Sequence, residues 1–467
     1  MEMVSNLKRG AVSPSEALVA AYTRIEAVDN DVHALPTLCR DRAENVARTI
    51  EDDKDTQRER RNDPSWLAGL PVAIKDLTDV EGVRTTYGSP IYTDHVPDKS
   101  DILVQQLEAN GAVIIGKSNS PEFGAGGNSF NEVFPSTRTP WDTSRTSGGS
   151  SGGAAAALAS GQVWLANGSD LGGSLRTPAS FCGIVGLRPS PGRIASGPNP
   201  QPFNTLAVEG PMARDVADTA LFLDAMVGMH PADPLSLGKP EASFRSLLKN
   251  FSGKRRVAFS PDLGISPVDP EVIKVCERAV TKLSDMGWEI TDQAPDIKGS
   301  METFQVLRAA SFAAGMSELL DTNRALLKPD IIWNIEKGLK QSQEDVAKAE
   351  CARGTLYHKM VTFFESHDLL ICPTACTLPF DVEQQSLKSL GDHAFDNYME
   401  WLALPSVLSL TSCPVLSLPV GFSEAGLPVG MQLVAPPRAE HLLLAAAYKA
   451  EQALEVGSAN PIDPKTF

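Results

Sequence analysis

The most informative stretch of the sequence is GSDLGGSLR at residues 168–176. It places Ser174 directly after two glycines, with Asp170 before the serine and Arg176 after it. A Gly-Gly-Ser turn alone is common, so its meaning depends on the surrounding sequence. A second glycine- and serine-rich stretch, SGGSSGG at 147–153, precedes an alanine-rich segment. A flexible linker would also be rich in glycine and serine. However, residues 147–153 form only a brief run, and the glycine-rich stretch 168–176 follows closely.

A lysine stands at the end of a third stretch, GLPVAIKD at residues 69–76. Residues 70–74 are apolar and predict a short buried strand that delivers Lys75 at its end. A lysine alone would most often lie on the surface. One that closes an apolar strand is harder to solvate, which makes Lys75 a candidate for a shifted pKa.

Composition limits the possible partners. The chain has 467 residues, of which 42% are hydrophobic and 21% charged, and its net charge is −16. These values are typical of a globular enzyme, and the negative charge opposes binding to nucleic acid or to anionic membranes. The seven cysteines form no disulfide pattern and the N-terminus has no apolar signal segment, so we expect a cytoplasmic protein.

No metal or cofactor is expected from the motifs. Cys372 and Cys376 lie close in sequence, but no second pair or flanking histidines complete a zinc site. GAVIIGKS at 111–118 fits the phosphate-binding P-loop letter for letter. In a P-loop, flexible residues turn backbone N–H groups onto phosphates, whereas the intervening residues here predict an apolar strand. Nucleotide binding is therefore the weaker interpretation.

The longest uncharged run, residues 402–423, has about the length of one membrane span. Pro405, Pro414 and Pro419 interrupt it, and proline in a helix interior breaks or kinks the helix. We predict buried strand and loop here, and no membrane partner.

Strand and helix patterns alternate along the whole chain, which favours an α/β fold whose sheet is covered by helices on both faces. No long linker divides the sequence, so a single domain is expected over residues 1–467, with an N-terminal helical segment (about 1–65), a core rich in motifs (about 66–215) and a C-terminal region (216–467). The predicted strands are 70–74, 112–115, 257–259, 369–372, 415–418 and 429–434. The predicted helices are 13–25, 100–110, 154–160, 269–286, 301–320, 344–366 and 440–454.

Taken together, these motifs resemble the amidase signature family of hydrolases. The resemblance extends through GKSNSPEF at 116–123, TPWD at 139–142, GLRPS at 186–190 and GLPVGMQ at 426–432, and thus over essentially the whole chain. The spacing between Lys75, Ser150 and Ser174 also agrees with the family. The departures are mild, chiefly Ser169 and Leu171, where threonine is common. The implied fold is a mixed, twisted sheet covered by helices.

The resemblance implies a catalytic triad. Ser174 would be the nucleophile, Ser150 the bridging serine held by a cis peptide, and Lys75 the base, since a serine hydroxyl is unreactive until a base takes its proton. The acyl-enzyme would be released by water. Backbone N–H groups would form the oxyanion hole, those of Leu171, Gly172, Gly173 and Ser174. None of the seven histidines lies in these motifs, so a Ser-His-Asp triad is the weaker alternative.

Further residues are expected to support this site. Ser151 neighbours the bridging serine, and Asp170 and Arg176 would pin the nucleophile loop by charge-assisted hydrogen bonds; a simple structural ion pair is the alternative. The loop of Gly124, Ala125, Gly126 and Gly127 resembles the one whose backbone faces the substrate.

Two active functions fit the resemblance. One is a free-standing hydrolase of amides, including aryl amides, with carbamates or esters as further candidate substrates; the other is the glutamine-hydrolysing subunit of a tRNA-dependent amidotransferase. YMEWLALP at 398–405 is aromatic and aliphatic, which suits a bulky apolar group better than glutamine. We therefore expect a small amide with an apolar or aromatic group as substrate. We also expect the protein to be a monomer or a homodimer. A third possibility, an inactive interaction protein, conflicts with the intact triad.

Overall fold

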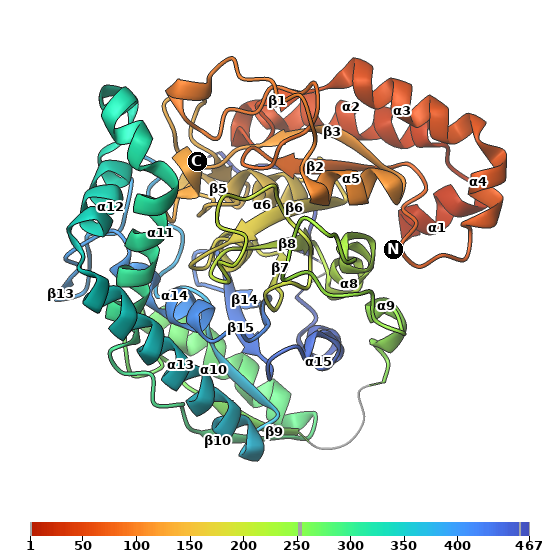
Figure 1. Ribbon diagram of the computed structural model, residues 1–467. Helices are drawn as coiled ribbons and strands as arrows, with labels where there is room; N and C mark the ends of the chain where they lie inside the picture. Colours follow the sequence, from red (N-terminus) through yellow and green to blue (C-terminus); the bar gives the residue numbers. More distant parts are fainter. Residues whose placement is uncertain (1, 251–254, 457–458, 467) are drawn as a thin grey trace.

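An 11-stranded sheet forms the centre of the computed structural model, which describes residues 2–250, 255–456 and 459–466 (Figure 1). The order of its strands is β1-β3-β2-β6-β8-β7-β14-β15-β11-β9-β10. The strands are β1 (Thr37–Leu38), β2 (Leu70–Lys75), β3 (Ala112–Ser118), β6 (Leu165–Asp170), β7 (Val185–Arg188), β8 (Val208–Ala213), β9 (Arg255–Phe259), β10 (Trp288–Asp292), β11 (Leu369–Pro373), β14 (Val415–Phe422) and β15 (Pro428–Val434).

The sheet is mixed, as the sequence predicts. Strand β2 runs parallel to β3 and β6, whereas β8 runs antiparallel to β6 and β7, and β14 antiparallel to β7 and β15. All three regions expected from the sequence, residues 1–65, 66–215 and 216–467, contribute strands to it. Two short hairpins lie outside the sheet, β4 (Arg138–Thr139) with β5 (Asp142–Thr146) and β12 (Ser389–Leu390) with β13 (His393–Ala394).

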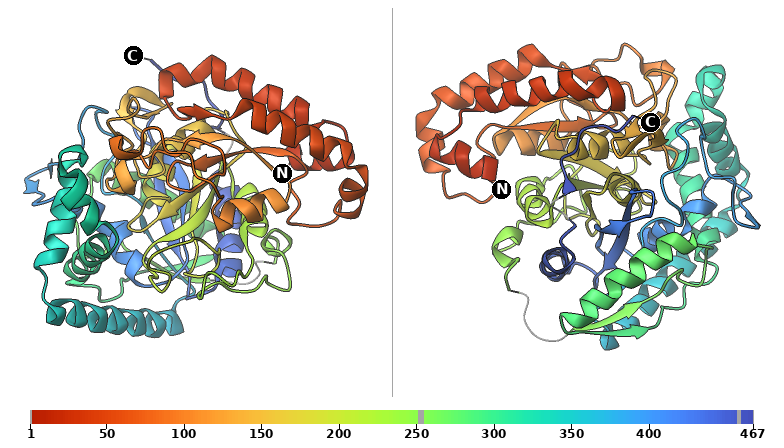
Figure 2. Two further views of the ribbon diagram at one scale, coloured as in Figure 1. Left: turned by 45° about the horizontal axis from the view of Figure 1, so that its top comes forward. Right: turned by 180° about the vertical axis from the view of Figure 1, so that it is seen from behind.

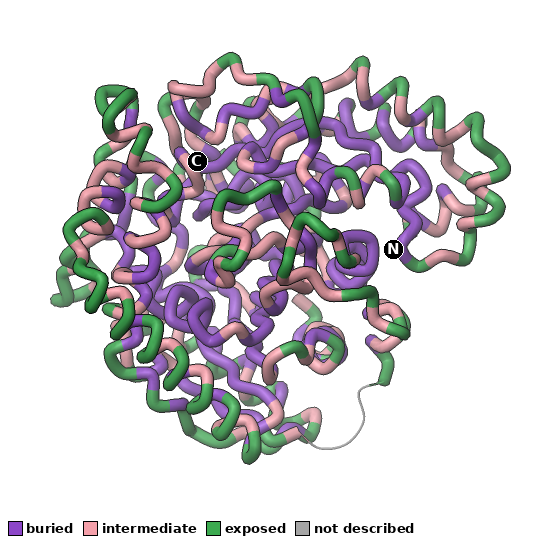
Figure 3. The backbone as a smooth tube through the Cα atoms, in the orientation of Figure 1, coloured by how far each residue is buried: buried purple, intermediate pink, exposed green. Residues whose placement is uncertain are grey.

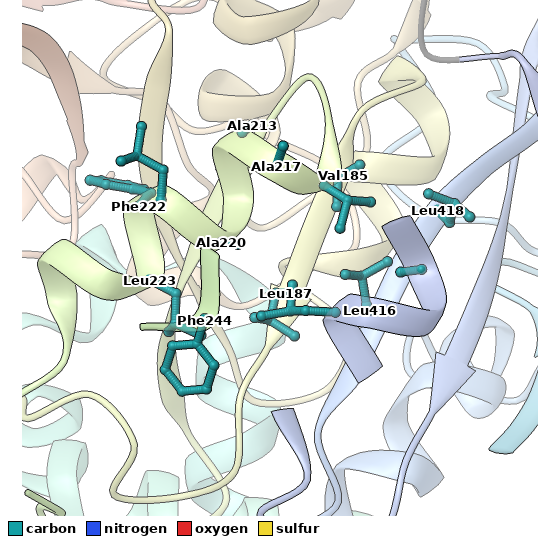
Figure 4. Packing of buried hydrophobic residues seen from close by; sticks show 14 of the residues in the cluster. Val185, Leu187, Ala213, Ala217, Ala220, Phe222, Leu223, Phe244, Leu416 and Leu418 are labelled. Carbon is teal, nitrogen blue, oxygen red and sulfur yellow. The ribbon is translucent and has the colours of Figure 1, made fainter. Parts of the chain in front are cut away.

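Helices cover both faces of the sheet. On one face, buried residues of β2, β7, β9 and β14 pack against α1 (Glu2–Arg9), α5 (Ile102–Ala109), α8 (Val216–Met226), α9 (Phe244–Leu247), α10 (Pro270–Asp285) and α15 (Glu440–Leu454). Figure 4 shows part of this layer, with Leu223 of α8 near Leu187 of β7, which lies beside its strand partner Leu416 of β14. The alternation of side chains along each strand places the neighbouring residues on the opposite face.

The opposite face has two groups of helices. Over β2, β3 and β6 lie α2 (Pro14–Val32), α3 (Arg40–Asp52), α6 (Gly152–Ala159) and α7 (Arg176–Cys182). Over β9, β11 and β15 lie α11 (Ser300–Asn323), α13 (Gln343–Ser366) and α14 (Ala403–Leu410), with α12 (Pro329–Lys340) packed on α11. Figures 1 and 2 show these groups at different edges of the molecule, and Figure 3 shows that the central strands are buried while the outer helices expose one side.

Every strand and helix predicted by range is found with the predicted type. Helix α2 begins as its sequence indicates: the Ser13 hydroxyl accepts a hydrogen bond from the Glu16 backbone N–H at 3.1 Å, and the Glu16 carboxylate accepts one from the Ser13 N–H at 2.8 Å. This reciprocal capping satisfies two N–H groups that have no partner within the helix. The helix continues to Val32, beyond the predicted end at residue 25.

The prediction for residues 402–423 was partly wrong. Its second half is strand β14, but its first half is helix α14 rather than strand or loop. Pro405 lies in the first turn of that helix, where backbone N–H groups have no intrahelical acceptor, so the missing N–H of proline costs no hydrogen bond. Among the described residues, no helix combines the length and the apolar character needed to cross a membrane.

The stretch that fits the P-loop pattern is part of the sheet. Strand β3 runs from Ala112 to Ser118 and therefore includes Lys117. The buried Lys117 ammonium donates to the Thr78 carbonyl oxygen at 2.5 Å and to the Thr85 hydroxyl at 2.8 Å. Its backbone and side chain are committed to the core, so they form no phosphate-binding loop.

Candidate active site

The predicted triad residues converge at one edge of the sheet. Lys75 ends strand β2, and the parallel neighbour β6 ends at Asp170, shortly before Ser174. Because parallel strands end at the same edge, the Lys75 side chain and the loop after β6 lie side by side. Ser150 lies in the loop before α6 and lines the same cavity as Ser174. The Ser151 N–H donates to the Ser174 carbonyl oxygen at 3.2 Å and joins the two serine loops.

The Lys75 amine is surrounded by hydroxyl groups. Its Nζ lies 2.7 Å from the Ser150 Oγ, 2.9 Å from the Ser151 Oγ and 3.0 Å from the Ser169 Oγ. The side chain is fully buried, and the Lys75 backbone N–H donates to the Asn167 Oδ1 at 2.7 Å. The structure thus brings together Lys75, Ser150 and Ser151 as predicted, and adds Ser169.

Burial lowers the pKa of Lys75 to about 7, and the carboxylates of Glu209 and Asp170 oppose this shift. Burial disfavours a charged amine because the protein interior solvates charge poorly. The same effect, reinforced by the charge of Asp101, raises the pKa of Glu209, while Lys75 lowers it. Glu209 lies on β8 and accepts a hydrogen bond from the Asn167 Nδ2 at 3.1 Å. A lysine with this pKa is substantially neutral in mildly alkaline solution.

The peptide bond between Gly149 and Ser150 is cis, as the resemblance implied. Gly149 is packed against the backbone of Asn128, and a Cβ at this position would come within 2.8 Å of it. The adjacent loop is held from the other side as well, because the Gly152 N–H donates to the Ser129 hydroxyl at 3.0 Å. Only glycine fits at position 149 without displacing this backbone.

Asp170 anchors the loop that carries Ser174. Its carboxylate accepts hydrogen bonds from the Gly173 and Leu175 N–H groups at 2.8 and 3.2 Å, and from the Arg176 Nε and Nη2 at 2.9 Å each. Arg188 adds a contact at 3.2 Å. Burial alone would raise the pKa of Asp170, but the two guanidinium groups hold it well below its usual range. Asp170 and Arg176 therefore support the loop as predicted.

We expect Asp170→Asn to lower the free energy of unfolding by about 3–5 kcal/mol, the range for breaking a buried charge pair. The substitution keeps the shape of the side chain but leaves two buried guanidinium groups without a counter-charge. Urea unfolding followed by circular dichroism measures the effect. Asp55→Asn is the matched control, since it removes a carboxylate from an ion pair whose side chains are 77% and 82% exposed. Equal stability of the two variants would contradict a role for Asp170 in holding the loop.

The predicted oxyanion donors are not equivalent. Among the described residues, the backbone N–H groups of Leu171, Gly172 and Ser174 form no hydrogen bond, so they remain free to meet a ligand. The Gly173 N–H is already used by Asp170, which corrects the prediction for this residue. Gly173 has φ +117°, and a Cβ there would lie 2.6 Å from Pro405; its role is to let the chain turn closely under the site.

A cavity of about 220 Å³ opens beside Ser150 and Ser174. Its apolar wall is formed by Leu77, Phe123, Leu171, Phe312, Met399 and Leu402. Met399 and Leu402 come from the aromatic and aliphatic stretch 398–405, as expected. Its polar wall also contains Ser169, Glu209 and Arg308, and the last two were not foreseen from the sequence.

Only half of the predicted substrate loop reaches this cavity. Gly124 and Gly126 line it. Ala125 is fully buried outside it, and its carbonyl oxygen accepts a hydrogen bond from the Lys328 ammonium. Gly127 packs so closely on Trp401 that a Cβ would come within 2.1 Å of the ring. These two residues shape the loop rather than face the cavity.

The two cysteines considered for zinc are both buried and separately engaged. The Cys372 Sγ accepts a hydrogen bond from the Gln432 amide at 3.5 Å, and the Cys376 thiol donates to the Trp401 carbonyl oxygen at 3.1 Å. In the part of the chain that the structure describes, no group of three or more His, Cys, Asp or Glu side chains is arranged to hold a metal ion.

Comparison with known sequences agrees with this geometry. The family model described as Amidase matches residues 16–444. The acylamidase of Rhodococcus erythropolis is 33% identical over 466 residues, covering 99% of this chain and 96% of that protein. A glutamyl-tRNA(Gln) amidotransferase subunit of Moorella thermoacetica (strain ATCC 39073 / JCM 9320) is 34% identical over 484 residues, covering 98% of this chain and 97% of that protein.

Solved structures of amide-hydrolysing enzymes superpose on nearly the whole chain. A bacterial aryl acylamidase belonging to the amidase signature enzymes superposes with a TM-score of 0.88 at 25% identity, covering 98% of both chains. A 6-aminohexanoate cyclic dimer hydrolase complexed with substrate superposes with a TM-score of 0.87 at 26% identity, also over 98% of both chains. The match of the family model to nearly the whole sequence, together with relatives above 30% identity, shows that this chain belongs to the amidase signature family.

Proposed function

We propose that this family member is a serine hydrolase that cleaves the C–N bond of small amides through an acyl-enzyme on Ser174. The observation that carries the proposal is the buried amine of Lys75, 2.7 Å from the Ser150 hydroxyl. A buried amine with a lowered pKa is a base that works near neutral pH. It would act on Ser174 through Ser150, the relay that the resemblance implies.

The hydrogen bonds around Lys75 suit this relay. A neutral amine has two N–H donors and one lone pair. Donation to Ser151 and Ser169 uses both N–H groups and leaves the lone pair to accept the Ser150 proton. Ser150 can then take the proton of Ser174 as the Ser174 oxygen attacks the amide carbonyl carbon.

The tetrahedral intermediate would place its oxyanion at the free N–H groups of Leu171, Gly172 and Ser174. Donors that are already oriented stabilise the developing charge without reorganising. The proton then passes back through Ser150 to the leaving nitrogen, and the C–N bond breaks to release the amine. Water attacks the acyl-enzyme with the same proton route, which yields the carboxylic acid and restores Ser174.

The cavity supports a substrate with an apolar or aromatic group, because six large apolar or aromatic side chains line it. The names of the acylamidase and aryl acylamidase relatives are consistent with this class. Carbamates and esters fit the same acyl-transfer chemistry. We propose that the enzyme acts in the cytoplasm, as a monomer or homodimer, without a metal or nucleotide cofactor.

A second candidate is the glutamine-hydrolysing subunit of a tRNA-dependent amidotransferase. The observation that favours it is the 34% identity to an amidotransferase subunit over 98% of this chain. The stretch 398–405 favours the free-standing amidase, because it contributes the apolar side chains of Met399 and Leu402 to the cavity. The charged groups of the cavity, Glu209 and Arg308, come from other elements.

A panel of 4-nitroanilides, a phenyl carbamate and free glutamine separates the two candidates. We expect the purified chain to release nitroaniline with a kcat/KM at least tenfold above that for ammonia release from glutamine, before and after dialysis against EDTA. A preference for glutamine would favour the role in an amidotransferase. Activity that is lost on chelation and restored by a divalent metal would contradict the serine mechanism.

A further inference from the structure

Arg308 lies in the wall of the cavity that contains Ser174. It is on helix α11, is only 4% exposed, and lines the cavity together with Phe312 from the next turn of the same helix. The α11–α12 region carries none of the family motifs, so neither the sequence nor the proposed mechanism gives this guanidinium a function.

This buried cation has no counter-charge in the described part of the chain. It donates a hydrogen bond to the amide oxygen of Asn334 and lies over the rings of Phe312 and Tyr398, with its carbon 4.3 and 5.5 Å from their centroids. Glu209 lines the same cavity, but no ion pair joins it to Arg308. Aromatic faces offset only part of the cost of burying a guanidinium.

The other two buried arginines near the site make the contrast clear. Arg176 and Arg188 are both fully buried, and both pair with Asp170 at 2.9 and 3.2 Å. Buried charges are normally paired in this way, because an uncompensated charge is costly. Arg308 departs from that rule at the cavity wall, where a ligand could supply the missing charge.

The guanidinium is also held in a fixed orientation. The Asn334 Nδ2 donates to the Tyr398 hydroxyl at 2.7 Å and to the Asp330 carbonyl oxygen at 2.6 Å, which directs the Asn334 oxygen toward Arg308. A guanidinium has five N–H donors in a planar fork that matches a carboxylate. Asn334 and the Tyr398 hydroxyl use part of these donors, and the others are available to a group in the cavity.

We propose that the cavity binds amides that carry a carboxylate, with Arg308 as the residue that selects them. The mono-amides of dicarboxylic acids are the simplest substrates of this class: an apolar chain would pack on the apolar wall, and the far carboxylate would pair with Arg308. The inference rests on the proposed function, because it assigns the substrate class of that same site.

The test compares substrates that differ only in charge. The mono-4-nitroanilides of succinic and glutaric acid are paired with neutral analogues in which an isopropyl group replaces the carboxylate. For wild type we expect at least one charged anilide to exceed its neutral analogue about tenfold or more in kcat/KM. Arg308→Gln lowers kcat/KM for that charged anilide by about 10²-fold and for the neutral one by less than about threefold, and Arg308→Lys lies between them.

Equal loss on charged and neutral anilides in Arg308→Gln, or a wild type that prefers the neutral analogue at both chain lengths, would overturn the proposal. If Arg308→Gln fails to fold, the wild-type preference and Arg308→Lys decide. The affinity of the Ser174→Ala chain for the same anilides, measured by calorimetry, shows whether charged anilides bind more tightly than neutral ones in the absence of turnover. A charge preference in binding together with a Ser174→Ala variant that still hydrolyses anilides would reject the mechanism but retain the carboxylate site.

Discussion

Ser174→Ala is expected to lower amide hydrolysis by at least about 10⁴-fold, the scale found when the nucleophile of a serine hydrolase is removed. The side chain is replaced by a smaller one in a partly exposed loop that Asp170 holds independently through the Gly173 and Leu175 N–H groups. The fold is therefore expected to persist while the atom that would form the acyl-enzyme is lost. Release of nitroaniline from the best anilide of the panel measures the change.

A serine-directed fluorophosphonate supplies a second measurement. Mass spectrometry of the wild-type chain should place the adduct on Ser174, and the Ser174→Ala chain should not be labelled at any serine lining the cavity. Ser284→Ala, an exposed position on α10, is the matched control and is expected to keep full activity and labelling. More than a few per cent of wild-type activity in Ser174→Ala would reject Ser174 as the nucleophile.

The residues of the site that the sequence predicts well are those in contiguous motifs. Lys75 follows an apolar strand, and Ser150 and Ser174 lie in glycine-rich loops whose neighbouring sequence is distinctive. Local chemistry also predicted the pairing of Asp170 with Arg176, which the structure confirms with two hydrogen bonds of 2.9 Å. In these cases the residues that interact are close in sequence or belong to one motif.

Glu209 could not be predicted in the same way, because its place depends on the pairing of strands. It faces Ser169 only through the antiparallel register of β8 against β6. Nothing within the stretch VEGPMA indicates which strand lies beside it. The same holds for Arg188, which reaches the Asp170 carboxylate from strand β7.

The position of Arg308 in the cavity wall could not be predicted from the sequence either. Residues 231–343 hold few recognisable motifs, and one arginine on a long helix most simply indicates a solvated surface. The structure instead places Arg308 among aromatic rings and against the cavity. The packing of α11 on α12 and on the distant α14 decides this burial, and nothing in the sequence of α11 itself indicates which of its faces these helices cover. The residue that we propose to select the substrate therefore lies in the part of the chain that sequence motifs describe least.

Lys75→Met is expected to lower kcat/KM for anilides by about 10²–10⁴-fold, the usual contribution of a general base. Methionine retains the unbranched length of the side chain but has no lone pair that can take the Ser150 proton. Activated esters, whose leaving groups need little protonation, are expected to lose less activity than matched anilides. Equal losses on both substrates would argue against a proton relay through Lys75.

The pH dependence of this activity identifies the base directly. The relay requires neutral Lys75, and burial lowers the pKa of Lys75 to about 7. Below that pH the protonated amine has no lone pair, so kcat/KM for wild type is expected to rise with pH through about 7 and then to level off. Lys75→Met, assayed on an activated ester that keeps its rate measurable, is expected to lack this rise.

Lys117→Met is the matched control for that profile. Lys117 is equally buried, and burial also lowers its pKa, to about 8, but it lies in strand β3 and does not line the cavity. Its replacement is therefore expected to leave the rise near pH 7 in place, even if the protein is less stable. A rise that persists in Lys75→Met, or that disappears in Lys117→Met, would show that Lys75 is not the group whose deprotonation activates Ser174.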